Sequence, residues 1–139
     1  MQKFSVALLA CFGFFSFSAQ ADVSSAEQFA SEYGVHAKQD NPKSTLTAAA
    51  GRAFYTKKVM VNDKDLSCST CHTDSPAQTG KHPDTGKPIQ PLAPSANASR
   101  FSDRQKSEKN FTQHCLDLYG KNCTAQEKGD FITYLLTVK

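Results

Sequence analysis

The chain has 139 residues, enough for one small domain, and its formal net charge of +3 reflects 16 Lys and Arg against 13 Asp and Glu. This weak charge, with no basic stripe interleaved with aromatic residues, excludes a strongly basic nucleic-acid-binding protein. Only 39% of the residues are hydrophobic, so a large buried ligand would help to complete the core of a single domain.

Residues 1–21 have the pattern of a secretory signal peptide. A lysine near the start is followed by an apolar run from Phe4 to Phe17 and by the small-x-small sequence Ala19-Gln20-Ala21. The run is too short to be kept as a membrane span. A lipoprotein signal ending at Cys11 is disfavoured because the apolar run continues beyond it. We therefore expect an exported chain in which residues 22–139 form one domain.

Two helices are predicted in the first part of this domain. Ser24 and Glu27 form a capping box that opens the first one. The second is predicted from Thr45 to Tyr55, where alanines favour a helix. Gly51 lies inside it, although a glycine there costs roughly 1 kcal/mol relative to alanine. We interpret Gly51 as the place where another helix approaches closely.

The segment Cys68-Ser69-Thr70-Cys71-His72 is a Cys-x-x-Cys-His sequence, the attachment signature of a c-type haem. Two thiols add to the two vinyl groups of the porphyrin, and the histidine supplies an imidazole nitrogen to the iron. A thioredoxin-like dithiol is disfavoured because Asn62 to Asp65 predicts a polar loop instead of a strand before Cys68. A zinc knuckle is disfavoured because no second Cys/His pair follows at a matching spacing. One covalent haem c is therefore predicted at Cys68, Cys71 and His72.

Residues 73–94 form a long, polar, proline-rich stretch that we expect to wrap the haem edge as a loop. The part from Gly80 to Lys87 is only faintly similar to a phosphate loop. Its glycine spacing is one residue too long, and Pro88 stands where a Ser or Thr is needed.

The last part of the chain predicts two more helices. The first runs from Ser102 to about Tyr119, and a capping box at Thr124 and Glu127 opens the second. No alternating strand pattern and no internal repeat stand out. We therefore expect an all-α fold with long loops around one covalently bound haem.

Cys115 and Cys123 flank the end of the first of these helices and its glycine stop at Gly120. Export places them in an oxidising compartment, so we predict a structural disulfide. For so short a loop the chain-entropy model gives a stabilisation of roughly 2–3 kcal/mol.

Three features together resemble the landmarks of a class I cytochrome c: Gly51 to Tyr55, the haem motif at 68–72, and Phe131 to Leu135. In that family the first and last landmark helices cross at the small glycine, beside the haem. The resemblance covers most of the chain after the signal peptide and implies the class I cytochrome c fold.

An ordinary class I cytochrome c holds its iron between the motif histidine and a methionine well downstream. This chain has only Met1, in the signal peptide, and Met60, which precedes the motif. We interpret Met60 as a packing residue near a helix end. The sixth ligand is therefore a different residue, or the sixth position is open.

Four residues are candidates for that position. His36 and His114 are both predicted to be surface residues, although the reach of His114 depends on the phase of its helix. His82, in the long loop, would give a low-spin bis-imidazole haem. Asn97 lies in a stretch stiffened by prolines and is otherwise a turn or capping residue. Composition alone favours His82 over Asn97.

The runs Thr85 to Asn97, Arg100 to Asp103 and Glu127 to Phe131 closely resemble the sphaeroides haem protein group. Members of this group are small class I cytochromes c in which an asparagine is the sixth ligand. The resemblance implies that Asn97 is the distal ligand and His72 the proximal one. The group also has a disulfide, which matches the pair predicted above.

The resemblance further implies that the amide oxygen of Asn97 is a weak-field ligand that is displaced on reduction, leaving a position for O₂, NO or CO. The displaced amide could donate a hydrogen bond to a bound gas. We therefore expect a periplasmic monohaem cytochrome c that transfers electrons and binds diatomic gases. The alternatives are a bis-histidine electron shuttle that uses His82, and a haem enzyme that transforms oxygen or NO.

An enzyme would need an acid or base above the iron, for which the candidates are Arg100, Arg104 and His82. We expect binding instead of turnover. The expected form is a monomer whose partners are other haem proteins, such as a dihaem or membrane-bound cytochrome. Four lysines flank the haem region in sequence, and they either steer acidic partners or are solvated surface residues: Lys57, Lys58, Lys81 and Lys87.

Overall fold

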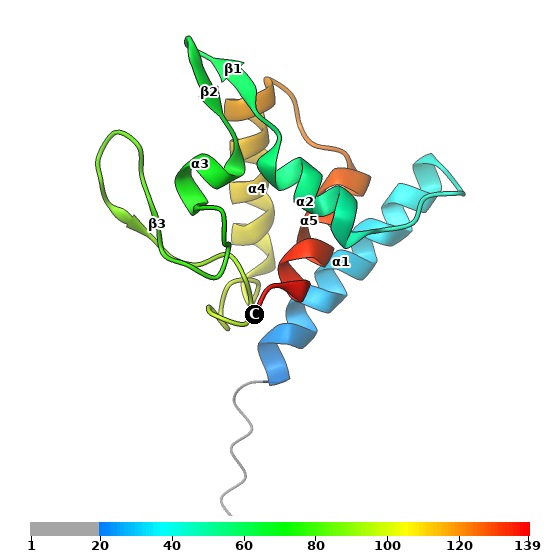
Figure 1. The fold of residues 1–139 in the computed structure, drawn as a ribbon. Helices are drawn as coiled ribbons and strands as arrows, with labels where there is room; N and C mark the ends of the chain where they lie inside the picture. The colour runs from blue at the N-terminus through cyan, green and yellow to red at the C-terminus, as the bar shows by residue number, and fades with distance from the viewer. Residues whose placement is uncertain (1–19) are drawn as a thin grey trace, which may run out of the picture.

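The computed structural model describes residues 20–139, with side chains from residue 25 onward (Figure 1). The predicted signal peptide, including the alternative at Cys11, lies outside the described residues except for its last two positions. Helices dominate the described part of the chain, which confirms the all-α fold. They are α1 (Gln20–Asp40), α2 (Ala48–Thr56), α3 (Cys68–His72), α4 (Arg104–Tyr119) and α5 (Ala125–Thr137). None of the helices in residues 20–139 is long and apolar enough to cross a membrane.

The core lies where α1 and α2 pack against α5. At the α2–α5 crossing, a Cβ atom added to Gly51 would lie 1.9 Å from the carbonyl oxygen of Asp130. At the α1–α5 contact, a Cβ atom on Gly129 would lie 2.6 Å from Leu46 and 3.2 Å from the Cβ of Tyr33. The two helices can therefore approach α5 this closely only because glycines stand at the contacts, which confirms the interpretation of Gly51.

The start of α2 is fixed by α5. Thr47 caps the helix by accepting a hydrogen bond from the amide of Ala50 at 3.1 Å. The backbone amide of Thr47 itself donates to the buried carboxylate of Asp130 in α5, at 2.6 Å. The helix thus begins at Ala48 instead of the predicted Thr45, because the tertiary contact with Asp130 holds Thr47 in an extended conformation.

The other predicted helix ends agree with the structure in the second half of the chain. Asp103 caps α4 by accepting from the amide of Lys106 at 2.9 Å. Thr124 and Glu127 form the predicted capping box of α5. At the first helix the prediction was wrong, because α1 already begins at Gln20 and the predicted cap at Ser24 lies inside it.

Two short antiparallel hairpins complete the fold: β1 (Val59–Val61) pairs with β2 (Lys64–Leu66), and β3 (Gly80–Lys81) pairs with β4 (Pro88–Ile89). The sequence did not predict them, because strands of two or three residues are too short to show an alternating pattern. Asn62 and Asp63 form the first turn with left-handed backbone angles, φ +48° and +61°. The predicted polar loop from Asn62 to Asp65 is therefore the hairpin turn followed by the first two residues of β2, so a short strand does precede Cys68. Met60 lies on β1 with 67% of its surface exposed, so its interpretation as a packing residue was wrong.

Candidate functional site

The Cys-x-x-Cys-His motif forms α3, a single helical turn between β2 and the long loop. Ser67 precedes it in an extended conformation, and its amide donates to the side chain of Thr70 at 2.9 Å. Because residues three or four apart share one face of a helix, this turn presents both thiols and the His72 ring on neighbouring positions. Cys68 and Cys71 are the free cysteines among the described residues.

His72 is held from two sides. The hydroxyl group of Tyr55, in α2, donates to the backbone carbonyl oxygen of His72 at 3.0 Å. On the other side Gly80, in β3, contacts the motif so closely that a Cβ atom there would lie 2.2 Å from the carbonyl oxygen of Cys71. The motif is thus fixed between α2 and the β3–β4 hairpin, and His72 itself is buried.

The pKa values of His72, Cys68 and Cys71 fit a site that binds a metal cofactor better than a redox-active pair of thiols. Burial, followed by the nearby Arg100 and His114, lowers the pKa of His72 to about 4, so its imidazole is neutral at pH 7. Neutral imidazole is the form that binds a metal. Burial raises the pKa of Cys68 to about 11 and that of Cys71 above its ordinary value. Catalytic dithiols have lowered thiol pKa values instead.

The imidazole ring of His114, in α4, lies near the ring of His72, and the two ring planes are tilted by 53°. Their ring centres lie 6.3 Å apart. Two imidazole nitrogens on opposite sides of one metal, each about 2 Å from it, would place their ring centres roughly 6 Å apart. The sequence had placed His114 on the surface, and its side chain is indeed exposed, but the phase of α4 turns it toward the haem motif.

A second contact fixes the tautomer of His114. Its Nδ1 atom lies 2.6 Å from the backbone carbonyl oxygen of Asn110, one turn earlier in α4. A carbonyl oxygen can only accept, so Nδ1 carries a proton, and in the neutral imidazole Nε2 keeps the lone pair that can bind a metal. This is the arrangement in which histidine ligands of metals are usually held.

The other candidates for the sixth position make local contacts. The amide nitrogen of Asn97 donates to the carbonyl oxygen of Pro91 at 3.0 Å, and its oxygen accepts from Ser99 at 3.2 Å. The ring of His82 lies exposed in the β3–β4 turn, where its Nδ1 accepts from the amides of Asp84 and Thr85. Coordination by Asn97 stays a prediction.

His36 lies on the exposed side of α1, next to Gln39, which agrees with its prediction as a surface residue.

The structure contains the predicted disulfide between Cys115 and Cys123, with Cα atoms 5.6 Å apart. It joins the last turn of α4 to the residue before the cap of α5. Since Cys115 directly follows His114, the disulfide fixes the end of α4 that carries this imidazole.

The residues around α3 fit a covalently attached haem. The donor set consists of two free thiols and two neighbouring imidazoles. The hydroxyl group of Tyr119, near Cys68, is buried and has no hydrogen-bond partner within the described part of the chain. Burial, with Cys68 adding to it, raises the pKa of Tyr119 to about 12. An unsatisfied hydroxyl beside the thiols is expected where a further group belongs.

Comparison with known proteins also relates the chain to c-type cytochromes. Residues 41–135 match the family model described as "Domain of unknown function (DUF1924)". The chain is 42% identical to cytochrome c'' of Methylophilus methylotrophus over 133 residues, which cover 94% of this chain and 92% of that protein. It is 38% identical over 89 residues to the cytochrome c-type protein SHP of Cereibacter sphaeroides, covering 63% of this chain and 68% of SHP.

Solved structures of the same two proteins share the fold. The crystal structure of oxidised cytochrome c'' from Methylophilus methylotrophus superposes with a TM-score of 0.80 at 40% identity, covering 85% of this chain and 98% of that one. The structure of oxidised SHP, an oxygen-binding cytochrome c, superposes with a TM-score of 0.70 at 32% identity, covering 79% of this chain and 94% of that one. The chain therefore belongs to the cytochrome c'' family, represented by the DUF1924 model, and it is a haem c protein with the class I cytochrome c fold.

Proposed function

We propose that this protein is an electron-transfer cytochrome in which His72 and His114 would both hold the iron in the oxidised state, and that reduction would weaken the bond of His114 so that this histidine detaches reversibly. The open position then accepts a diatomic gas. The observation that carries the proposal is the neighbouring pair of imidazole rings, whose centres lie 6.3 Å apart. When bound, the haem supplies an iron that exchanges one electron and takes a gas at an open axial position.

The two histidines differ in how firmly the protein holds them. His72 is buried, and its backbone is fixed by Tyr55 and by the glycine contact at Gly80. His114 is exposed and is held by one hydrogen bond within its own helix. His72 is therefore the permanent ligand, and His114 is the one that can move aside into solvent.

Two relatives support the release of a ligand and the binding of a gas. A solution structure of Methylophilus methylotrophus cytochrome c'', which is 42% identical and has a TM-score of 0.75, bears on haem-ligand detachment in that protein. SHP is an oxygen-binding cytochrome c. Asn97 was predicted from resemblance to the SHP group. We propose His114 in its place because its ring centre lies 6.3 Å from that of His72 and its Nδ1 is engaged by Asn110, which supports Nε2 as the ligating atom.

The test compares single alanine variants of the three candidate ligands in the purified holoprotein. Electron paramagnetic resonance of the oxidised protein should show a bis-imidazole low-spin signal that disappears in H114A. N97A and H82A should keep it. In the reduced wild-type protein CO should bind, and its association should be faster in H114A because no ligand must leave first. If N97A alone loses the native low-spin signal, His114 is not the ligand.

We also propose that the protein is periplasmic, on the basis of the signal-peptide pattern in residues 1–21. Its partners are proposed to be other haem proteins with acidic docking surfaces. Exposed lysines lie on both sides of α3: Lys57 and Lys58 before it, and Lys81 and Lys87 on the β3–β4 hairpin. Electron-transfer rates with an acidic cytochrome should therefore fall steeply as ionic strength rises.

A further inference from the structure

The helix that carries His114 is the most loosely attached long helix of the described chain. α1 and α2 lie directly against α5, whereas the backbone of α4 approaches α1 and α5 at few points. α4 is held mainly by side chains that reach across to its neighbours. One is Phe111, whose ring meets that of Phe131 edge to face with centres 5.1 Å apart. Tyr119 is another, with its ring centre 5.5 Å from that of Phe54 in α2. Arg104 pairs with Glu32 in α1, and the remaining contacts belong to a polar cluster around Glu108.

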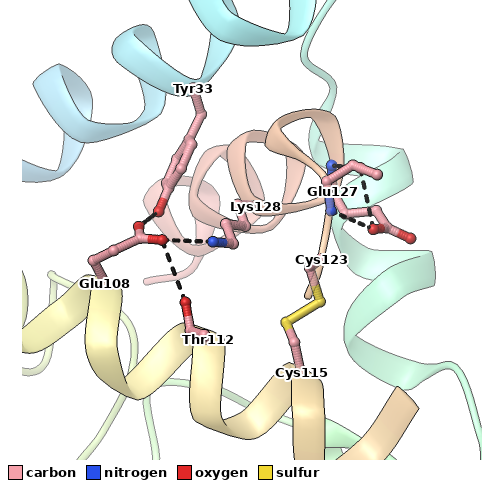
Figure 2. A network of polar contacts seen from close by, with 8 residues as sticks. Tyr33, Glu108, Thr112, Cys115, Cys123, Glu127 and Lys128 are labelled. Carbon is pink, nitrogen blue, oxygen red and sulfur yellow. Dashed lines mark hydrogen bonds and ion pairs between the residues drawn. A yellow bond between two sulfur atoms is a disulfide. The ribbon is translucent and has the colours of Figure 1, made fainter. Parts of the chain in front are cut away.

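Glu108 lies in the first half of α4 and connects it to two other helices (Figure 2). One carboxylate oxygen accepts a hydrogen bond from the hydroxyl group of Tyr33 in α1. The other accepts from Nζ of Lys128 in α5 at 2.6 Å, and from Thr112, one turn later in α4, at 3.4 Å. We call Tyr33, Glu108 and Lys128 the Glu108 clamp.

The clamp binds more strongly than an ordinary surface ion pair. The side chain of Lys128 is only 5% exposed, whereas that of Glu108 is 43% exposed. A buried ammonium group is costly without a counter-charge, so Lys128 holds Glu108 in place. Burial alone would raise the pKa of Glu108, but the hydrogen bonds from Lys128 and Tyr33 outweigh it and lower the pKa below its ordinary value. The carboxylate is therefore charged at neutral pH.

The clamp spans a gap between helices. An open cavity of about 690 Å³ lies beside it between α1 and α4, lined by Phe29, Tyr33, His36, Glu108 and Lys128 among others. Because side chains do not fill this space, the separation of α4 from α1 depends on bridging contacts more than on close packing, and of these the clamp is the more buried and the Glu32–Arg104 ion pair the more exposed. The opposite end of α4 is tied by the Cys115–Cys123 disulfide. His114 lies between these two attachments.

We propose that Glu108 is a positioning residue for the sixth ligand: the Glu108 clamp sets the position of α4 and thereby how readily His114 leaves the haem. This inference rests on the proposed function. A weakened clamp lets α4 move away from α1, so the reduced protein spends more time with His114 detached. The clamp thus governs gas access at a distance, without touching the haem motif.

The experiment measures the association rate of CO with the reduced holoprotein by flow mixing, together with the ferric low-spin signal. Three clamp variants are compared: Y33F, E108Q and the double variant E108Q/K128M. The double variant leaves no unpaired buried charge, so it keeps the test valid if E108Q folds poorly. We expect a several-fold faster CO association in all three, with the low-spin signal of the oxidised protein retained.

Two controls separate positioning from general stability. Glu32 and Arg104 also form an ion pair between α1 and α4, but both side chains are about half exposed, at 49% and 48%. E32Q replaces a carboxylate by an amide, as E108Q does, but at a residue outside the Glu108 clamp. It should leave the rate of CO association unchanged. T47A removes the cap of α2, away from α4, and should lower stability without changing the rate.

An unchanged CO rate in all three clamp variants, or an equal rise in E32Q and T47A, would overturn the inference. The proposed function fails on a different result, namely an H114A variant that keeps the wild-type ferric signal and CO rate. If CO association with the reduced protein is faster in H114A but unchanged in the clamp variants, His114 remains the proposed ligand. Glu108 then does not control its release, and the inference fails.

Discussion

The contact between α2 and α5 and the attachment of α4 represent two ways of holding a helix. At Gly51 the backbones of α2 and α5 touch, and no side chain fits between them. α4 instead stands beside an open cavity and is held by Glu108, by an aromatic contact and by a disulfide. The first arrangement is rigid because nothing can shift without a clash, whereas the second has a few separable attachments.

This difference matches the roles proposed for the two histidines. His72 depends on the rigid region through Tyr55, which belongs to α2. His114 depends on the adjustable region, because α4 carries it. A cytochrome that must keep one ligand and release the other benefits from placing them on supports of different stiffness. The predictions below challenge that difference, beginning with the largest expected effect.

The rigid region should tolerate no added atom at Gly51. In G51A the new methyl group would meet the carbonyl oxygen of Asp130 at 1.9 Å, so α2 and α5 must separate. We expect a loss of about 3 kcal/mol or more in the free energy of unfolding, at the upper end of overpacking effects. Urea unfolding of the holoprotein measures it. G120A is the control: Gly120 has φ +67° and open space around it, so only backbone strain of about 1 kcal/mol is expected.

The disulfide should matter for both stability and ligand release. Replacing Cys115 and Cys123 by serine should lower the free energy of unfolding by about 2–3 kcal/mol, since the loop that they close is short. Because Cys115 follows His114, CO association with the reduced protein should also become faster. A double-serine variant with lowered stability and an unaltered CO rate would show that this attachment does not restrain His114.

The contribution of Glu108 to stability should depend on pH. The folded-state pKa of Glu108 lies below its ordinary value of 4.5, so the carboxylate stabilises the fold fully above about pH 4.5, and this contribution is lost as the pH falls through the folded-state pKa. E108Q should be less stable than the wild type by about 1–2 kcal/mol at pH 7, because charged hydrogen bonds are lost but the group is partly exposed. The difference in unfolding free energy between the wild type and E108Q, measured at several pH values, should vanish at low pH. A difference that stays constant from pH 7 to pH 3 would contradict the charged state assigned to Glu108.

The smallest effects concern the helix caps. Asp103 caps α4 and Thr47 caps α2, each through one side-chain hydrogen bond. D103A and T47A should each lose about 1 kcal/mol of stability in thermal unfolding. Only D103A should alter CO association, because only α4 carries His114. If CO association in D103A is as slow as in the wild type and in T47A, the first turn of α4 does not influence the release of His114.

Much of the rigid region could be predicted from the sequence. The haem motif, the capping box at Thr124 and the close approach at Gly51 each depend on residues a few positions apart, or on one glycine that makes sense only at a helix crossing. In the adjustable region the disulfide was predicted, because the export signal implies an oxidising compartment and Cys115 and Cys123 flank the end of a predicted helix.

The adjustable region was harder to predict for a physical reason. The phase of α4 decides whether His114 faces solvent or His72, and this phase is set by contacts with residues distant in sequence, such as Tyr33. α4 is mostly polar, so no clear apolar stripe indicates its buried face. Asn97 was favoured instead through resemblance. Its proline-stiffened loop proved to be held by local hydrogen bonds.

The most direct test of the account is the ligand pair of the oxidised holoprotein, read from near-infrared magnetic circular dichroism. We predict the band position of two imidazole ligands in the wild type, and the loss of that band in H114A while N97A keeps it. An imidazole–amide ligand pair in the wild type, or a bis-imidazole band that survives in H114A, would contradict the assignment of His114.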